Sequence, residues 1–182
     1  LESLEALSPR QHITFDGFVA IADTLRTEAK SAIATAQAAG ITVRMITGDH
    51  FETAYHIGRE LGLVHHRSEV FDSRQMSMMS DDDLAERLKT IRVCARVLPE
   101  YKHRILEILK QYDITAMTGD GVNDIPALTN AHVGVAMGSG AQIAKDAGDI
   151  ILLDNNFRSI VSAIHEGRTV YANIKRMVTY LL

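Results

Sequence analysis

Residues 114–136 read ITAMTGDGVNDIPALTNAHVGVA and predict a strand, a loop, a short helix and a second strand in succession. Residues 114–117 are expected to form a strand. A short helix is expected over 123–129, and a strand over 132–136. Because a helix connects the two strands, we expect them to run parallel in the same sheet.

The same alternation extends along the rest of the chain. An extended stretch is expected over 13–22, strands over 41–46, 69–71, 92–96 and 149–153, and helices over 24–39, 52–61, 99–111, 142–147 and 156–182, with a further helix that begins at Ser80. This order predicts the α/β class, with a doubly wound parallel sheet covered by helices on both faces. Ligands of such sheets bind beyond the carboxyl ends of the strands.

Composition narrows the class of protein further. The 182 residues are 46% hydrophobic and 23% charged, which suits a packed domain. A net charge of -4 argues against a general nucleic-acid binder. The single cysteine, Cys94, excludes an internal disulfide framework. The first residues lack the pattern of a secretory signal, and we expect the chain to come from the middle of a longer one.

The loop that follows the strand at 114–117 carries three oxygen-bearing side chains. Asp120, Asn123 and Asp124 lie within five positions, between a strand and a helix. Carboxylates of this kind suit Mg²⁺, which usually binds one or two of them together with a substrate phosphate. The alternative is a turn rich in Asp and Asn that only caps the helix.

Two further segments place phosphate-binding chemistry at strand ends. The string MITGD, residues 45–49, repeats the MTGD arrangement, so Thr47 could donate its hydroxyl and the amides of Gly48 and Asp49 could face a phosphate oxygen. Lys102 falls in the first turn of a helix, where a cation is unfavourable unless an anion lies nearby. The alternative for MITGD is an ordinary turn stabilised by its own side chains, and the alternative for Lys102 is a lysine exposed to solvent.

Four strings together resemble one family, the P-type cation-transporting ATPases. They are MITGDHFETA at 45–54, CARVLPEYK at 94–102, TAMTGDGVNDIPALTNAHVGVAMG at 115–138 and AKDAGDIILLDNNFRSI at 144–160. The match looks like the second part of the cytoplasmic phosphorylation domain in the calcium, sodium and proton pump branch. The wider group is the haloacid dehalogenase-like hydrolases.

This resemblance implies a site, cofactors and an organisation. The implied site residues are Thr47, Gly48, Asp49, Lys102, Asn123 and Asp124 for catalysis, Arg96 near the nucleotide ribose, Asp120 for Mg²⁺, and Asp23 and Arg26 at the hinge. The implied cofactor is Mg²⁺, and ATP is the substrate. Residues 1–155 would form the phosphorylation domain, and residues 156–182 a stalk helix leading to a transmembrane segment, at the cytoplasmic face of a membrane.

The sequence departs from the family pattern in two places. The hinge string reads D-T-L-R from Asp23 to Arg26, without the proline that the family usually has. The family nucleophile is an aspartate in D-K-T-G-T, and that string is absent from these residues. Asp23 follows an apolar run, but Leu25 and Arg26 do not supply the residues that a nucleophile of this type needs.

Three readings therefore stand. The first is a fragment of a cation pump that is inactive by itself. Its partners would be the nucleophile strand, the nucleotide-binding and actuator domains and the transmembrane helices of the same pump, and the pump would also bind the transported cation. The second is a free-standing phosphatase that uses Asp23. The third is a non-catalytic module that binds phosphate or nucleotide. In the family fold the nucleophile strand lies between the strands that end at Asp49 and Asp120. Without it, the sheet must close the gap, borrow a strand from another chain or leave exposed edges prone to association.

Overall fold

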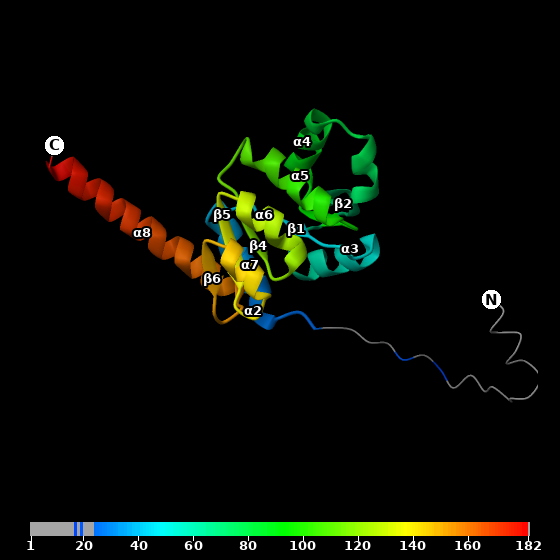
Figure 1. The fold of residues 1–182 in the computed structure, drawn as a ribbon, viewed down its shortest axis with the longest axis horizontal. Helices are drawn as coiled ribbons and strands as arrows, with labels where there is room; N and C mark the ends of the chain where they lie inside the picture. Colours follow the sequence, from blue (N-terminus) through cyan, green and yellow to red (C-terminus); the bar gives the residue numbers. More distant parts are fainter. Residues whose placement is uncertain (1–16, 18, 20–23, 182) are drawn as a thin grey trace, which may run out of the picture.

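Six strands form two three-stranded sheets in the computed structural model, which describes residues 17, 19 and 24–181 (Figure 1). The first sheet has the order β1-β3-β2 and the second the order β4-β5-β6, and every pair is parallel. The strands are β1 (Met45–Ile46), β2 (Val70–Asp72), β3 (Val93–Ala95), β4 (Ala116–Gly119), β5 (Val133–Met137) and β6 (Ile150–Leu152). The α/β class with parallel strands is confirmed.

The expected single sheet is instead observed as two. Within the described residues, β1 and β4 each pair with one strand only, so each leaves one edge without a partner. The strand expected over 41–46 is also shorter, because only Met45 and Ile46 are in register with β3. The extended stretch expected over 13–22 lies outside the described residues, apart from positions 17 and 19.

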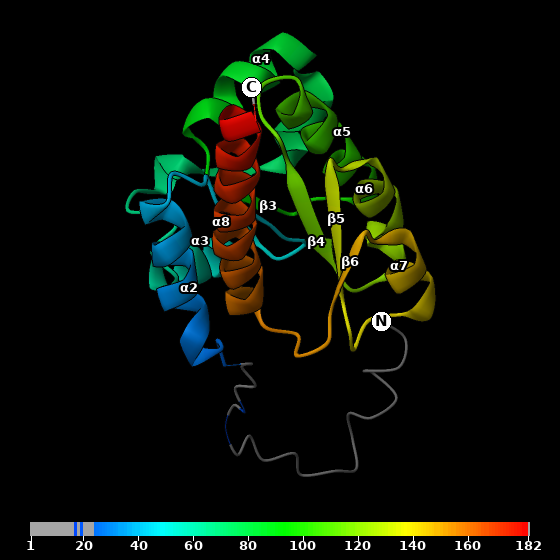
Figure 2. The same cartoon turned by 90° about the vertical axis from the view of Figure 1, so that its left-hand side faces the viewer.

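Helices lie on both sides of the strands. Figure 2 shows α5, α6 and α7 on one side and α2, α3 and α8 on the other. They are α2 (Thr27–Ala38), α3 (Phe51–Glu60), α4 (Asp81–Thr90), α5 (Pro99–Lys110), α6 (Ile125–Asn130), α7 (Gln142–Ala147) and α8 (Phe157–Leu181), with the 3-10 turns η1 (Arg67–Glu69), η2 (Ser73–Met78) and η3 (Val122–Asp124). The doubly wound arrangement of helices is therefore present.

Both faces of the first sheet are buried, because its side chains alternate between two apolar clusters. Val93 and Ala95 of β3 belong to one apolar cluster, which includes Ala54 of α3. Cys94, between them, belongs to a second cluster with Ile105 of α5. Successive residues of a strand face opposite ways, so one short strand contributes to both clusters. The sheet is thereby fixed between two helical layers, and its carboxyl ends are held in place.

Helix boundaries follow local signals that the sequence contains. The Ser80 hydroxyl accepts a hydrogen bond from Asp83 N at the start of α4, as expected of an N-cap. Pro99 occupies the first turn of α5, where its missing N–H costs nothing. Gly40 and Gly62 lie just after the ends of α2 and α3 and have φ values of +79° and +75°, which residues with a side chain rarely adopt.

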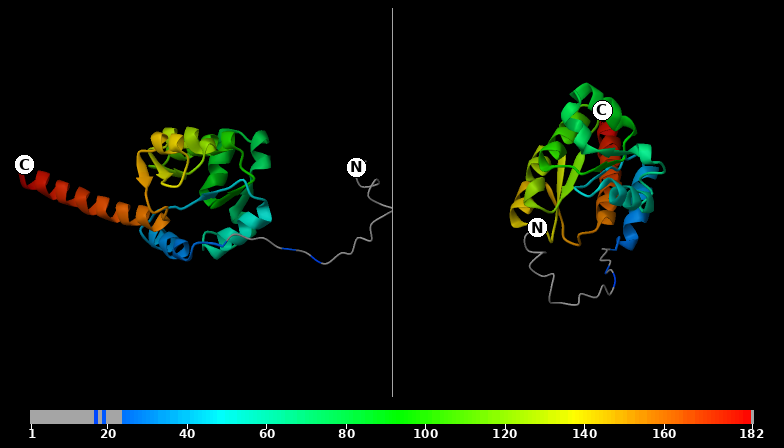
Figure 3. Two further views of the ribbon diagram at one scale, coloured as in Figure 1. Left: turned by 60° about the horizontal axis from the view of Figure 1, so that its bottom comes forward. Right: turned by 90° about the vertical axis from the view of Figure 1, so that its right-hand side faces the viewer.

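Helix α8 is 25 residues long and projects away from the strands (Figure 3). Its first part packs against α2, and Arg168 Nη1 donates to Ala39 O at 3.0 Å. None of the α8 residues that the structure describes is buried. Apolar side chains such as Val170, Ile174 and Met177 are exposed along it. Across residues 24–181, no helix has both the length and the apolar character that crossing a membrane requires.

Candidate functional site

Three polar loops follow the carboxyl ends of β1, β3 and β4. Backbone hydrogen bonds hold the first two loops together: Thr47 N donates to Cys94 O, and Val97 N donates to Thr47 O, both at 2.9 Å. Arg96 N donates to Asp49 O at 2.8 Å. The loops that contain Thr47 and Arg96 therefore form one rigid unit at the end of the first sheet.

An ion pair connects this unit to the second sheet. Lys102 Nζ lies 2.6 Å from Asp124 Oδ1, although the two residues belong to α5 and η3. Their side chains are only 19% and 10% exposed. Asp124 supplies an anion beside Lys102, so the position of this cation in the first helical turn does not by itself require a phosphate. The partly buried pair thus joins the helix that follows β3 to the loop that follows β4.

The loop after β4 is shaped around Asp124. A Cβ at Gly119 would lie 2.5 Å from Asp124 Cβ, so only glycine allows the carboxylate to fold back over the strand end. Gly121 N donates to Asp124 Oδ2 at 3.4 Å. The Asp124 carboxylate is thereby held by both the loop and Lys102. Asp124 immediately precedes α6, but its side chain makes no cap hydrogen bond to that helix, and its bond to Gly121 N closes the short turn η3 instead.

Asp120 is fixed through its backbone while its side chain is exposed. Asp120 O accepts a hydrogen bond from Ala141 N at 2.9 Å, and a Cβ at Gly140 would lie 2.6 Å from that oxygen. Asn123 is exposed too. Gly140 lets the chain pack closely against the backbone of Asp120, and the sequence analysis did not identify it. The two glycines of the string MGSGA, directly after β5, were the signal that could have indicated it.

Thr47 and Asp49 form a closed turn after β1. Thr47 Oγ1 donates to Asp49 Oδ2 at 2.7 Å and accepts from Asp49 N at 3.1 Å. This is the turn chemistry that the sequence analysis kept as an alternative. Gly48, at the tip of the turn, is exposed. The hydroxyl of Thr47 thus already has a partner, and it would have to exchange that partner to donate to a phosphate.

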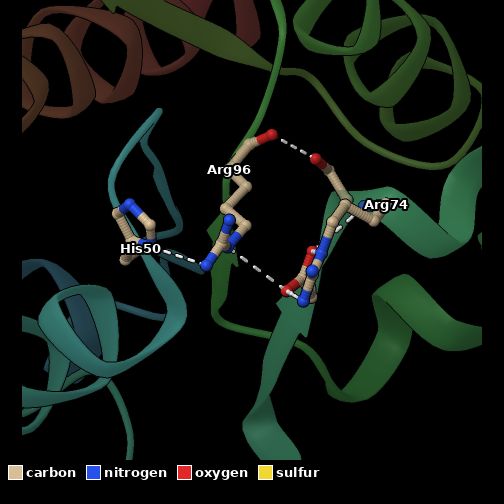
Figure 4. A network of polar contacts seen from close by, with 5 residues as sticks. His50, Arg74 and Arg96 are labelled. Carbon is tan, nitrogen blue, oxygen red and sulfur yellow. Dashed lines mark hydrogen bonds and ion pairs between the residues drawn. The ribbon is translucent and has the colours of Figure 1, made fainter. Parts of the chain in front are cut away.

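Arg96 is part of a polar network with His50, Asp72 and Arg74 (Figure 4). Its backbone is left-handed, with a φ of 55°, directly after β3. Its guanidinium contacts His50 Nδ1 through Nη2 and lies 3.6 Å from Asp72 Oδ2 through Nε. Arg74 lowers the pKa of the Asp72 carboxyl by donating hydrogen bonds to it, so Asp72 is charged at neutral pH.

The remaining site predictions fall outside these contacts. Arg26 is exposed at the residue before α2, and Asp23 lies outside the described residues. Among residues 24–181, no group of three or more His, Cys, Asp or Glu side chains is placed to hold a metal ion. A single exposed carboxylate, Asp120, still fits Mg²⁺ as one ligand, because that ion usually takes one or two carboxylates and completes its shell with water and phosphate.

Comparisons with known proteins agree on one family. Residues 2–132 match the haloacid dehalogenase-like hydrolases, and residues 102–164 match a second family of the same description. The chain is 45% identical over 174 residues to calcium-transporting ATPase 1 of Bacillus cereus, covering 94% of this chain and 20% of that protein. It is 43% identical over 175 residues to a calcium-transporting ATPase of Bacillus subtilis, covering 93% and 19%.

Solved structures give the same result. A crystal structure of a zinc-transporting PIB-type ATPase in its E2.Pi state has a TM-score of 0.66 and 33% identity, covering 85% of this chain and 21% of that chain. The chain therefore spans about a fifth of the length of the proteins it resembles.

Proposed function

The chain belongs to the haloacid dehalogenase-like hydrolases and is the form of that domain carried by P-type ATPases, and from this premise we propose that it forms the magnesium-binding and phosphate-stabilising half of an aspartyl-phosphate site in a calcium pump. The observation that carries the proposal is the ion pair between Lys102 and Asp124, which links the loops at the ends of the two sheets. ATP is the substrate of the whole protein.

The roles of the strand-end residues follow from charge and placement. Lys102 stabilises negative charge on a phosphoryl group, because its ammonium is held at the strand ends in a partly buried position. Asp124 fixes that ammonium, and Asn123 supports the same loop. The turn of Thr47, Gly48 and Asp49 orients the phosphoryl oxygens from the neighbouring strand.

Asp120 is the residue of this chain that would hold Mg²⁺. Its carboxylate is exposed, and its backbone is anchored by the loop at Gly140, so the ligand is presented from a fixed position. When bound, Mg²⁺ supplies positive charge to the phosphate oxygens. The remaining ligands would be water, phosphate and groups from outside the chain, which agrees with the absence of a larger acidic cluster among the described residues.

The proposal gives the other predicted residues a place in the whole pump. Arg96 contacts the nucleotide near its ribose, Asp23 and Arg26 form the hinge, and residues 156–182 form a stalk leading to a transmembrane helix at the cytoplasmic face. The exposed apolar side chains of α8 are consistent with a stalk that continues toward a membrane. The aspartate that accepts the phosphate, the nucleotide-binding and actuator domains and the transmembrane helices are contributed from outside these residues.

A chimaera tests the proposal directly. The segment of the Bacillus cereus calcium-transporting ATPase 1 that matches this chain is replaced by it, and calcium-dependent ATP hydrolysis is measured in membranes. We expect the chimaera to be active. Lys102→Met and Asp120→Asn should each reduce its turnover by at least about a hundredfold. The first removes a positive charge that stabilises the transition state, and the second removes the carboxylate that would hold Mg²⁺. Lys89→Met, which changes a surface pair with Glu86, is the matched control.

Two results would contradict the proposal. One is a chimaera whose ATPase activity is unchanged by Lys102→Met and Asp120→Asn. The other is hydrolysis of ATP or of a small phosphate ester by the isolated chain, lost in Asp23→Asn, which would instead establish the free-standing phosphatase. Nucleotide binding by the chain with no effect of Asp120→Ala would favour the non-catalytic module.

A further inference from the structure

The carboxylate of Asp72 is shared unequally between two arginines (Figure 4). Arg74 Nε donates to Oδ1 at 2.9 Å and Arg74 Nη2 donates to Oδ2 at 2.7 Å, so Arg74 occupies both oxygens. Arg96 Nε lies 3.6 Å from the same Oδ2, which is too long for a hydrogen bond. The forked contact is the stronger kind of pair, and it belongs to Arg74.

Arg96 is instead held by contacts that carry no negative charge. Its backbone N donates to Asp49 O, and its carbonyl oxygen accepts from the Ser73 hydroxyl. Its Nη2 contacts His50 Nδ1, and because a guanidinium can only donate, that ring nitrogen is the acceptor. The guanidinium of Arg96 is therefore positioned by its neighbours while its positive charge is left without a short ion pair.

We propose that Arg74 is a positioning residue that occupies Asp72 and thereby keeps the Arg96 guanidinium available for a phosphorylated nucleotide. This inference rests on the proposed role of Arg96 in nucleotide binding. Without Arg74, Asp72 would be a carboxylate with a side chain only 10% exposed and no forked partner. Such a group draws in the nearest cation, and Arg96 Nε lies only about 0.4 Å beyond the usual upper limit for a hydrogen bond to Asp72 Oδ2. A nucleotide would then have to displace Asp72 from Arg96.

The test uses the 182-residue chain labelled with ¹⁵N, and ATP as the probe. The NMR signal of the Arg96 Nε–H group reports whether that proton is bonded to Asp72. In Arg74→Gln we expect this proton to exchange more slowly with water and the affinity for ATP to fall about tenfold, the effect of one charge-assisted pair. In Arg74→Gln with Asp72→Asn, both values should return to within about twofold of the wild-type chain.

Two further variants separate positioning from folding. Arg74→Lys keeps a cation beside Asp72 and should restore most of the ATP affinity, whereas a general loss of structure would not be rescued. Lys89→Gln removes an exposed pair elsewhere and should change neither the Arg96 signal nor the affinity.

The proposal is overturned if the Arg96 signal is the same in Arg74→Gln as in the wild-type chain. It is equally overturned if the double variant binds ATP as weakly as Arg74→Gln, because Arg74 would then contact the nucleotide itself. Arg96→Gln tests the underlying function separately. If that variant, or the wild-type chain, shows no ATP binding that depends on Arg96, the nucleotide role of Arg96 fails, and the Nε–H signal alone decides whether Arg74 keeps Arg96 free.

Discussion

Asp124 illustrates how one side chain can connect two parts of a fold. Its carboxylate is 10% exposed and is neutralised by Lys102 from a different helix. A carboxylate in such a position is costly to leave unpaired, whereas removal of both charges is often tolerated. The pair therefore has a structural consequence that is separate from any catalytic one.

We expect Lys102→Met to lower the free energy of unfolding by about 2–4 kcal/mol, because Asp124 is then buried without its cation. Adding Asp124→Asn should recover at least half of that loss. Urea unfolding of the isolated chain at pH 7 measures both. Lys89→Met, whose pair with Glu86 is exposed, should cost less than about 1 kcal/mol. Equal losses for Lys102→Met and the double variant would show that the pair itself is not responsible.

Asp72 should make stability depend on pH. Hydrogen bonds from Arg74, aided by the charges of Arg74 and Arg96, lower its pKa in the folded chain despite partial burial. A lowered pKa stabilises the folded state above the unfolded value of about 3.9, and this contribution is lost as the pH falls through the lower, folded value.

The difference in unfolding free energy between wild type and Asp72→Asn should therefore be constant from pH 6 to 8 and shrink below about pH 4. Chemical unfolding at a series of pH values checks it, with Asp82→Asn on the exposed surface of α4 as the control. A difference that is the same at pH 7 and pH 3 would contradict the pKa shift.

At the scale of single elements, two glycines differ in whether their position could accept a side chain. Gly134 lies in β5, where a Cβ would meet Leu128 O of α6 at 2.5 Å. Gly167 lies inside α8, and a Cβ there would meet nothing within 4 Å. The first glycine permits a helix to approach a strand closely, while the second only weakens a helix.

Gly134→Ala should destabilise the chain by about 2 kcal/mol or more, since backbone must move to relieve the overlap. Gly167→Ala should stabilise α8 by about 1 kcal/mol. Thermal unfolding measures the first, and amide hydrogen exchange along α8 measures the second. A neutral Gly134→Ala would mean that α6 is not packed on β5 as closely as described.

The order and boundaries of the elements could largely be predicted from the sequence, because they depend on local signals. Ser80, Pro99 and Gly62 each act within one turn of helix. The Lys102–Asp124 pair could be anticipated only as an electrostatic need, since the partner comes from a loop 22 residues away. The network of Asp72 and Arg74 was missed, although Asp72 ends a strand beside the predicted site. Its role depends on the left-handed backbone of Arg96, for which no local residue pattern was available.

At the scale of the whole molecule, the division into two sheets has a chemical meaning. Among the described residues, β1 and β4 each have one edge without a strand partner. The ion pair of Lys102 and Asp124 lies in the segments that follow β3 and β4. Such edges pair readily with other extended segments. Under the proposed function, the strand that bears the phosphorylated aspartate would occupy them.

A peptide of apolar residues followed by Asp-Lys-Thr-Gly-Thr should therefore bind the chain and slow amide exchange in both β1 and β4. Parallel pairing on both sides buries the edges and adds backbone hydrogen bonds. Hydrogen exchange with mass spectrometry measures this, and a scrambled peptide of the same composition is the control. Slowing in only one of the two strands, or with both peptides, would contradict the arrangement.

Helix α8 behaves mechanically as a lever. It contacts α2, with Arg168 near its middle bonded to Ala39, and the residues beyond Arg168 span roughly 20 Å at 1.5 Å per residue. A tilt of about 10° at this anchor would displace the far end of the helix by roughly 3 Å. Any change in the angle between α2 and the sheets would therefore move the distal tip of α8 more than its base.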